Sequence, residues 1–268
     1  MFPESPVDLE RRFGGLQRLF GPQALTCLEQ AHVLVAGIGG VGSWCAEALA
    51  RSGVGRLTLV DMDHVAESNL NRQLHALEST LGQAKIGAMA ARIRDINPQC
   101  RVDLVDDFVS PGNVAALLRD VPDVIVDCTD QVQAKVALVL EARRSGSALI
   151  MCGGAGGKTD VLTLRGGDLA HAVQDALLAR VRHVLRRHHG FPAGTPRKGR
   201  ATAPRMGIEA LWVAQETRLP AARESFASGA TAGPQGLSCA GYGSLVTVTA
   251  GMGMAAAGQA LARLLASS

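Results

Sequence analysis

The sequence is poor in aromatic side chains and has no closely paired cysteines. Phe, Trp and Tyr make up 3% of the 268 residues, so the core must be built from Leu, Val, Ala and Ile. No C-x-x-C pair occurs, which removes the usual spacing of a structural zinc site, and no zinc is expected. The scattered cysteines indicate reduced thiols in a reducing compartment: Cys27, Cys45, Cys100, Cys128, Cys152 and Cys239.

The N-terminal residues lack a basic segment followed by an apolar core, the pattern of a secretory signal, so we expect a cytoplasmic protein. No charged residue stands between Glu224 and Arg263. The stretch 241–265, which overlaps this interval, is long enough to span a membrane, but it is rich in Gly, Ala, Thr and Ser. We interpret it as a buried helix in a tight core or a dimer interface, with peripheral membrane contact as the alternative.

Apolar runs alternate with helical patterns through the first 160 residues. Strands are predicted at 32–37, 56–61, 101–109, 123–130 and 148–157, and helices at 42–53, before Asn97-Pro98, and at 112–120 and 133–146. This alternation predicts an α/β fold with a doubly wound, Rossmann-like, mostly parallel sheet. Residues 9–30 predict an amphipathic helical segment broken at Gly14-Gly15 and Gly21-Pro22. The second half predicts a helix at 171–190 and loops at 191–207 and 221–240.

A glycine cluster follows the first predicted strand. Gly37, Gly39 and Gly42 form G-x-G-x-x-G, with Gly40 as an additional glycine. Glycines allow a tight turn and close approach to a phosphate, and the helix that follows offers free N–H groups. Asp61 ends the next strand about 20 residues later, where an acid can hold ribose hydroxyls. The pattern predicts a nucleotide-binding site.

The residues after Asp61 favour a triphosphate over a dinucleotide. Arg72 can hold a phosphate by a bidentate fork, Lys85 can neutralise developing charge, and Asp130 can hold Mg²⁺. Taken singly, each has a plainer interpretation. Arg72 could be a surface ion-pair partner, Lys85 a solvated lysine in the first turn of a helix, and Asp130 a helix cap.

Several segments together resemble the adenylating superfamily that includes ubiquitin-activating enzymes, MoeB and ThiF. They are "GIGGVGSW", "DMDHVAESNLNRQ", "LGQAK", "INPQCRV" and "DCTDQ". The resemblance implies activation of a carboxylate by attack on the α-phosphate of ATP. It also implies that the metal ligand is Asp130, that Arg72, Lys85 and Asp130 are catalytic, and that ATP is bound by Gly37, Gly39, Gly40, Gly42, Asp61, Asp63, Asn69, Arg72, Gln73 and Lys85.

Within that superfamily the chain most resembles the tRNA threonylcarbamoyladenosine dehydratase group. The similarity runs through 9–160, weakens, and resumes at "LSCAGYGSLVTVTAGMG". It implies one ThiF-like domain over 1–268, with a nucleotide-binding core at 9–160 and a substrate-binding or dimerisation elaboration at 161–268. It also implies a homodimer and, as further candidate partners, sulfur-transfer proteins.

Two positions depart from related patterns. Relatives of the MoeB type supply an N-terminal arginine to the partner subunit's ATP, and here "RRFGG" has glycine at the second arginine position. Arg12 and Arg18 are the candidates for that role. Cys239 lies in a dehydratase-like segment, but nothing in the sequence requires it to be a nucleophile.

A basic run lies between Asp175 and Glu209, where no acidic residue occurs. It also contains His183, His188 and His189. Such a run predicts contact with an RNA backbone, and a solvated helix face with a basic loop is the alternative. The predicted tRNA-binding residues are Arg180, Arg182, Arg186, Arg187, Arg197, Lys198, Arg200 and Arg205.

The sequence therefore predicts ATP-dependent cyclisation of threonylcarbamoyladenosine beside the anticodon of tRNA, with net loss of water. Three alternatives stay open. The same chemistry could activate the C-terminus of a ubiquitin-like or sulfur-carrier protein. The glycine turn could serve an NAD-dependent oxidoreductase, or the chain could be a binding scaffold without turnover.

Overall fold

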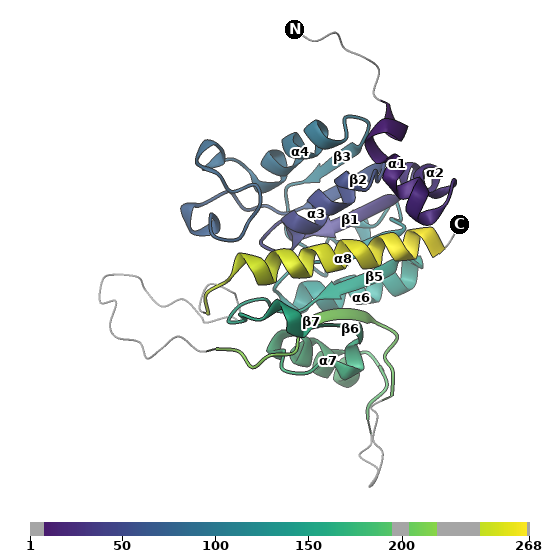
Figure 1. The fold of residues 1–268 in the computed structure, drawn as a ribbon. Helices are drawn as coiled ribbons and strands as arrows, with labels where there is room; N and C mark the ends of the chain where they lie inside the picture. Colours follow the sequence, from purple (N-terminus) through teal and green to yellow (C-terminus); the bar gives the residue numbers. More distant parts are fainter. Residues whose placement is uncertain (1–7, 195–203, 219–241, 267–268) are drawn as a thin grey trace.

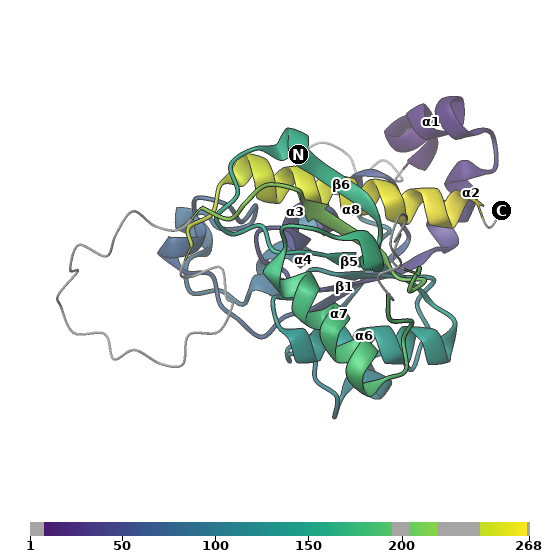
Figure 2. The ribbon, with the colours of Figure 1, turned by 90° about the horizontal axis from the view of Figure 1, so that it is seen from below.

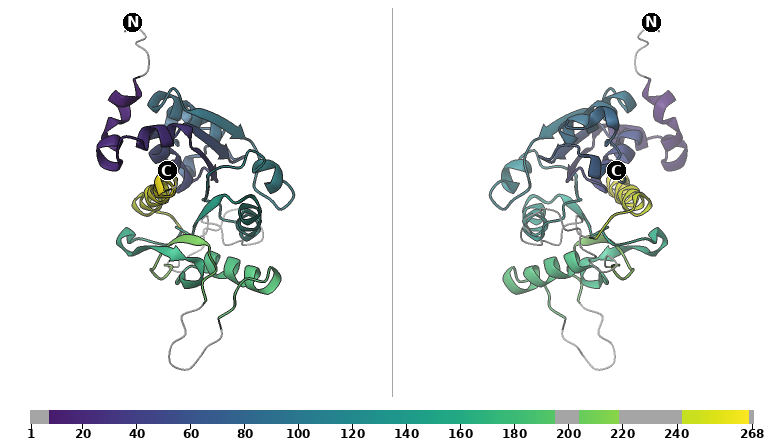
Figure 3. Two further views of the ribbon diagram at one scale, coloured as in Figure 1. Left: turned by 90° about the vertical axis from the view of Figure 1, so that its right-hand side faces the viewer. Right: turned by 90° about the vertical axis from the view of Figure 1, so that its left-hand side faces the viewer.

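The computed structural model describes residues 8–194, 204–218 and 242–266. Helices cover both faces of a central sheet (Figure 1). Figure 2 shows α8 on one side of the sheet and α6 and α7 on the other, and Figure 3 shows the same layers with α8 seen along its axis. The predicted loop at 221–240 and Cys239 lie outside the described residues.

The sheet has seven strands in the order β3-β2-β1-β4-β5-β7-β6. Only the β6–β7 pair is antiparallel among these neighbours. The predicted doubly wound, mostly parallel sheet is therefore confirmed. The strands are β1 His32–Ala36, β2 Arg56–Val60, β3 Arg101–Val105, β4 Val124–Asp127, β5 Ala148–Cys152, β6 Leu164–Asp168 and β7 Glu209–Val213.

Alternate strand residues serve the two apolar layers because side chains alternate along a strand. Val33 and Val35 pack in the cluster that contains α3, α4 and α8. Leu34 packs in the cluster of α5 and α6. The helices are α1 Leu9–Phe20, α2 Ala24–Gln30, α3 Gly42–Arg51, α4 Lys85–Ile96, α5 Val114–Leu117, α6 Val132–Ser145, α7 Ala176–His188 and α8 Val246–Ala266, with short 3₁₀ turns at Glu67–Asn69, Glu78–Thr80, Val161–Thr163 and Leu169–His171.

The strand order reverses between β1 and β4. The chain runs outward from β1 through β2 to β3, then returns to the other side of β1 with β4. At such a reversal the connections leave the carboxyl ends of the strands in opposite directions, and a crevice opens between them. This crevice is where the glycine turn lies.

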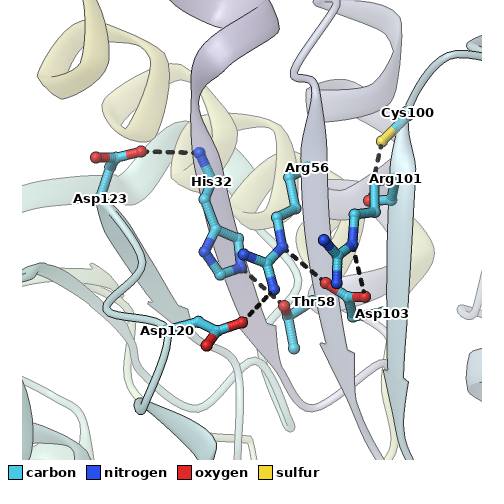
Figure 4. A network of polar contacts seen from close by, with 8 residues as sticks. All are labelled: His32, Arg56, Thr58, Cys100, Arg101, Asp103, Asp120 and Asp123. Carbon is cyan, nitrogen blue, oxygen red and sulfur yellow. Dashed lines mark hydrogen bonds and ion pairs between the residues drawn. The ribbon is translucent and has the colours of Figure 1, made fainter.

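Polar side chains link neighbouring strands near their amino ends, on the side of the sheet opposite the crevice (Figure 4). Arg56, at the start of β2, donates to Asp103 of β3 at 2.7 Å and to Asp120 at 2.6 Å. The backbone N–H of His32, at the start of β1, donates to Asp123 at 2.8 Å. These bonds link the first residues of β1 and β2 to the middle of β3 and to the residues before β4, so they hold four neighbouring strands in register away from the crevice.

One expectation about the elements was wrong, and two strands were not predicted. Gly14-Gly15 does not break the first helix, because α1 continues to Phe20 and ends at Gly21, whose φ is +99°. A glycine inside a helix costs only about 1 kcal/mol, which packing can offset. The second half also adds β6 and β7, for which no element was predicted. Gly166 and Gly167 occupy the middle of β6 and hide its alternation.

The uncharged stretch before Arg263 forms most of α8, a helix of the core. Val248, Met252 and Ala256 are fully buried. A Cβ on Gly253 would overlap the carbonyl oxygen of Val41, so α8 approaches α3 closely. In the part of the chain that the structure describes, no helix is long and apolar enough to cross a membrane. The alternative of membrane contact through 241–265 gains no support.

Candidate functional site

The glycine turn connects β1 to α3 and lies against the end of β4. Gly37 has φ +85°, and a Cβ there would lie 2.9 Å from the carbonyl oxygen of Cys128. A Cβ on Gly42 would overlap the carbonyl oxygen of Gly37. No side chain caps the first turn of α3. The N-terminal end of α3 therefore offers backbone N–H groups to an anion.

A cavity of about 300 Å³ opens in front of this turn. It receives residues from the carboxyl ends of β1, β2 and β4, from the segment between β2 and α4, and from the start of α8. Gly42 packs behind the turn and does not line the cavity. The predicted residues that do line it are Gly37, Gly39, Gly40, Asp61, Asp63, Asn69, Arg72, Gln73, Lys85 and Asp130.

Asp61 is buried directly after β2 and stabilises the glycine turn through hydrogen bonds from backbone N–H groups. One carboxylate oxygen accepts the backbone N–H of Ile38 at 2.7 Å, and the other accepts that of Asp63 at 2.9 Å. Burial raises the pKa of Asp61, while these N–H groups and Lys85 act in the opposite direction. The acid expected to contact ribose therefore also shapes the glycine turn.

Lys85 is the first residue of α4 and is 6% exposed. Its Nζ donates to Asp63 at 2.7 Å. The interpretation of Lys85 as a solvated surface lysine is wrong, because the chain holds this cation inside the cavity wall. A cation already held beside the glycine turn can neutralise phosphate charge with little reorganisation.

Arg72 lies across Gly40, with its Cγ 3.2 Å from the position of an added Cβ there. Its Nη1 donates to the carbonyl oxygen of Ser68 at 2.6 Å and to Asn71 at 2.9 Å. No carboxylate pairs with Arg72 among the residues that the structure describes. The guanidinium is thus fixed by neutral acceptors and keeps its positive charge for a ligand.

Asn69 and Gln73 flank Arg72 and are both buried. Asn69 accepts the backbone N–H of Ala66 at 3.1 Å and stabilises the local turn. The Oε1 atom of Gln73 is buried without a hydrogen-bond partner among the described residues. An unpaired buried acceptor beside the cavity is costly unless a ligand or water satisfies it.

Asp130 follows a tight turn at the end of β4 and is exposed. It does not cap α6, whose N-cap residue is Gln131. The turn is held by Asp127, which accepts from the N–H and the hydroxyl of Thr129 at 3.0 and 2.7 Å. Within the described ranges, no group of three or more His, Cys, Asp or Glu side chains gathers as a metal site.

A buried ion pair beneath the cavity was not predicted. Lys135 of α6 and Asp127 of β4 are both fully buried, 3.2 Å apart. Lys135 also donates to the carbonyl oxygen of Cys152, the last residue of β5, at 2.7 Å. The pair therefore joins the ends of two strands that form the cavity wall. An uncompensated charge at this depth would cost several kcal/mol, so the two residues depend on each other.

Further cavity residues were also missed. Asp107 and Phe108 follow β3, which ends at Val105, whereas the predicted strand continued to 109. Phe108 is 45% exposed and offers an aromatic face at the cavity. The position of Phe108 at the carboxyl end of a predicted strand, where ligands bind in such sheets, was the available sequence signal. Ser244 and Thr249 reach the cavity from the other end of the sequence, which no local pattern indicated.

The arginines of the basic run differ in their surroundings: some are exposed, and others bond to the backbone of the protein. Arg180, Arg187 and Arg205 are exposed. Arg182 donates inward to the carbonyl oxygens of Leu169 and Ala172, and Arg186 donates to that of Pro192. Two of the predicted RNA contacts therefore hold the local structure. Arg197, Lys198 and Arg200 lie outside the described residues.

Arg12 and Arg18 belong to α1, at the amino ends of the strands (Figure 1). Arg12 donates to the carbonyl oxygen of Ile96 at 2.9 Å, at the far end of α4 from Lys85. Neither residue lines the cavity of its own chain. A contribution of either arginine to a partner subunit stays a prediction.

The fold and the site together define an α/β protein with a phosphate-binding crevice at the switch point of its sheet. The model of the ThiF family matches residues 14–267, and the chain belongs to this family. It is 41% identical to the tRNA threonylcarbamoyladenosine dehydratase of Haemophilus influenzae, over 96% of this chain and 95% of that protein. It is 43% identical to the Escherichia coli K12 protein of the same name, over 96% and 94%.

A solved structure agrees with these relatives. The E. coli tRNA N6-threonylcarbamoyladenosine dehydratase TcdA, in complex with ATP, superposes with a TM-score of 0.82. The two chains are 40% identical, and the match covers 96% of this chain and 95% of that one. The family resemblance predicted from the sequence motifs is therefore confirmed.

Proposed function

We propose that this protein is an ATP-dependent tRNA threonylcarbamoyladenosine dehydratase. The observation that carries the proposal is the similarity to dehydratases of that name along almost the whole chain. A crevice with a phosphate-binding turn and two held cations supports it independently. The chemistry is adenylation of a carboxylate on the threonyl group of the modified adenosine, followed by ring closure.

In this proposal, a carboxylate oxygen of the substrate attacks the α-phosphate of ATP and pyrophosphate leaves. A nucleophile of the same side chain then displaces AMP and closes a ring, so the nucleoside loses one water. The N–H groups of the glycine turn and the N-terminus of α3 hold phosphate oxygens. Arg72 and Lys85 neutralise the charge that develops as the bond to pyrophosphate breaks. The protein supplies no nucleophile, because the second step is intramolecular.

Mg²⁺ is the expected companion of ATP, and Asp130 is its proposed ligand. Mg²⁺ is commonly held by one or two carboxylates together with phosphate oxygens and water, so a single exposed aspartate beside the glycine turn fits it. When bound, the ion would supply additional positive charge to the phosphates. The chain's own contribution is the turn held by Asp127, which presents Asp130 to the crevice.

The remaining expectations concern partners and location. We propose that exposed arginines of the basic run, including Arg180, Arg187 and Arg205, contact the tRNA backbone. Homodimerisation, a trans arginine from α1, cooperation with sulfur-transfer proteins and a cytoplasmic location stay predictions.

The deciding experiment measures conversion of ATP to AMP by the purified protein, with and without threonylcarbamoyl-modified tRNA, and the mass of the tRNA nucleosides. We expect AMP formation that requires the modified tRNA and a nucleoside lighter by one water. AMP formation that ignores tRNA but responds to a ubiquitin-like or sulfur-carrier protein would replace the proposal by carrier activation.

Site variants add a matched test. Arg72→Ala and Asp130→Ala each remove a proposed contact to phosphate or metal, and we expect turnover to fall at least ~100-fold. Glu78→Gln, an exposed carboxylate outside the cavity, serves as the control and should keep full turnover. Full activity of either site variant would contradict the proposed site.

A further inference from the structure

A second cavity, of about 710 Å³, lies at the amino ends of β5 and β7, opposite the carboxyl ends where the crevice opens. Its walls come from the C-terminal part of α6, the beginnings of β5 and β7, the end of β6, and the residues after α7 and before β7, including Phe191 and Arg205. α6 connects the two cavities, because Ala134 lines the first and Arg143 the second. At a rise of 1.5 Å per residue, these positions are about 14 Å apart.

Three arginines and two carboxylates line the second cavity, and the carboxylates are already engaged. Asp168 accepts the backbone N–H groups of Ala170, Met206 and Gly207 at 2.8–2.9 Å. Glu209 accepts two bonds from Arg263, at 3.0 and 2.8 Å. The acidic side chains therefore add little free negative charge to the cavity.

Arg143 and Arg205 remain available to a ligand. The guanidinium of Arg143 lies over the buried ring of Phe191, 5.4 Å from its centroid, and makes no ion pair within the described part of the chain. Arg205 is 82% exposed and reaches Asp168 only at 3.8 Å. By contrast, Arg144, the next residue after Arg143, is paired with Glu141.

We propose that this second cavity binds a nucleotide of the RNA substrate, with its phosphate against Arg143 and Arg205 and its base stacked on the Arg143 guanidinium. The inference rests on the proposed function. Guanidinium groups bind phosphates through paired N–H donors and stack on bases, and Phe191 holds this one in place. The cavity volume falls in the range of ligand pockets, about 300–1,000 Å³.

Along the axis of α6, the positions of Ala134 and Arg143 are about 14 Å apart, which is the length of about four stacked nucleotides at about 3.4 Å each. An adenosine that reacts in the crevice thus places a nearby nucleotide of the same strand at the second cavity. The site would position the tRNA without taking part in the chemistry.

The test measures tRNA affinity of the whole protein by fluorescence anisotropy across a series of salt concentrations. The Arg143→Ala/Arg205→Ala double variant is compared with Arg144→Ala, which removes a charge from the same helix turn but from outside the cavity. We expect the double variant to bind tRNA at least ~10-fold more weakly, with a shallower salt dependence, and to show a raised KM for tRNA. Arg144→Ala should stay within about twofold of wild type. Arg143→Lys, which keeps charge without a planar surface, should fall between them.

Equal affinities of the double variant and Arg144→Ala would overturn the inference. So would unchanged tRNA binding combined with loss of binding of free AMP at the second cavity, which would assign the cavity to a free nucleotide. Failure of the proposed function is recognised separately: wild type would then release no water from the modified tRNA. Binding of ATP without tRNA checks that each variant is folded.

Discussion

At the scale of single residues, spacing and chemistry predicted the cavity-lining side chains better than the ones that support them. Arg72 and Lys85 could be found because they follow Asp61 closely and, together with Asp130, suit a triphosphate, although each taken singly had a plainer interpretation. Lys135 and Asp127 could not, since a lysine inside a helix pattern predicts exposure, and only the fold shows that both are fully buried. Supporting residues leave no local pattern because their partners lie on other elements.

His75 provides a prediction about pH. It is 2% exposed, and burial, with a smaller contribution from Lys85, lowers its pKa from 6.5 to about 4. As the pH falls below 6.5, His75 becomes protonated in the unfolded chain but stays neutral in the folded chain. The free energy of unfolding therefore declines until about pH 4, where the folded chain is protonated as well. Between pH 7 and pH 5 this single group should cost about 2 kcal/mol.

Denaturant unfolding of wild type and His75→Leu at pH 7 and pH 5 measures this cost. Both ring nitrogens of His75 lack a partner among the described residues, so leucine leaves no polar group unpaired. We expect His75→Leu to lose about 2 kcal/mol less than wild type over this range. Identical pH dependence of wild type and His75→Leu would contradict the prediction.

At the scale of elements, the alternation of strands and helices in the first half could be predicted because β1, β2 and β4 are largely apolar and are buried over almost their whole length. The edge strand β3 is partly exposed. The strands of the second half were harder to predict from the sequence. β6 contains two glycines and lies at the edge of the sheet, where no continuous apolar run is needed. α8 was recognised as a helix, but its contacts with α3 depend on residues about 200 positions away in the sequence.

The close approach of α8 to α3 gives a second prediction. A Cβ on Gly253 would overlap the carbonyl oxygen of Val41, so Gly253→Ala should force the helices apart and cost about 1–3 kcal/mol. Gly258 lies on the exposed side of the same helix with nothing within 4 Å of an added Cβ. Gly258→Ala should therefore raise stability by up to about 1 kcal/mol.

Thermal unfolding followed by circular dichroism distinguishes the two alanines, which have equal helix propensity. A lower melting temperature for Gly253→Ala and a higher one for Gly258→Ala are expected. An increase of the same size in both would show that helix propensity, and not packing, controls the effect.

At the scale of the whole molecule, the crevice should couple nucleotide binding to stability. A ligand that binds only the folded chain stabilises it by about 2.7 kcal/mol at a concentration 100 times its Kd. For a chain of this size that corresponds to several degrees in melting temperature. We expect ATP to raise the melting temperature in this way and NAD to leave it unchanged, measured by scanning calorimetry over a range of ligand concentrations. A shift with NAD alone would return the site to the oxidoreductase alternative.

Properties of the whole molecule that involve a second chain could be predicted neither from sequence patterns nor from the structure of one subunit. A contact of Arg12 or Arg18 with ATP would require a second chain, because α1 lies at the amino ends of the strands of its own sheet, away from the crevice. The fold class, by contrast, followed from patterns within one chain and was confirmed.

The order of elements along the chain also governs when the crevice can form during synthesis. The glycine turn and its supporting strands leave the ribosome early, but Ser244 and Thr249 line the same cavity, and α8 covers α3. Contacts of such high sequence separation form late in folding. A nascent chain that lacks α8 would expose the apolar surface of α3 and an unfinished crevice. We therefore expect competence to bind nucleotide to be acquired only after α8 has been synthesised and has packed on α3.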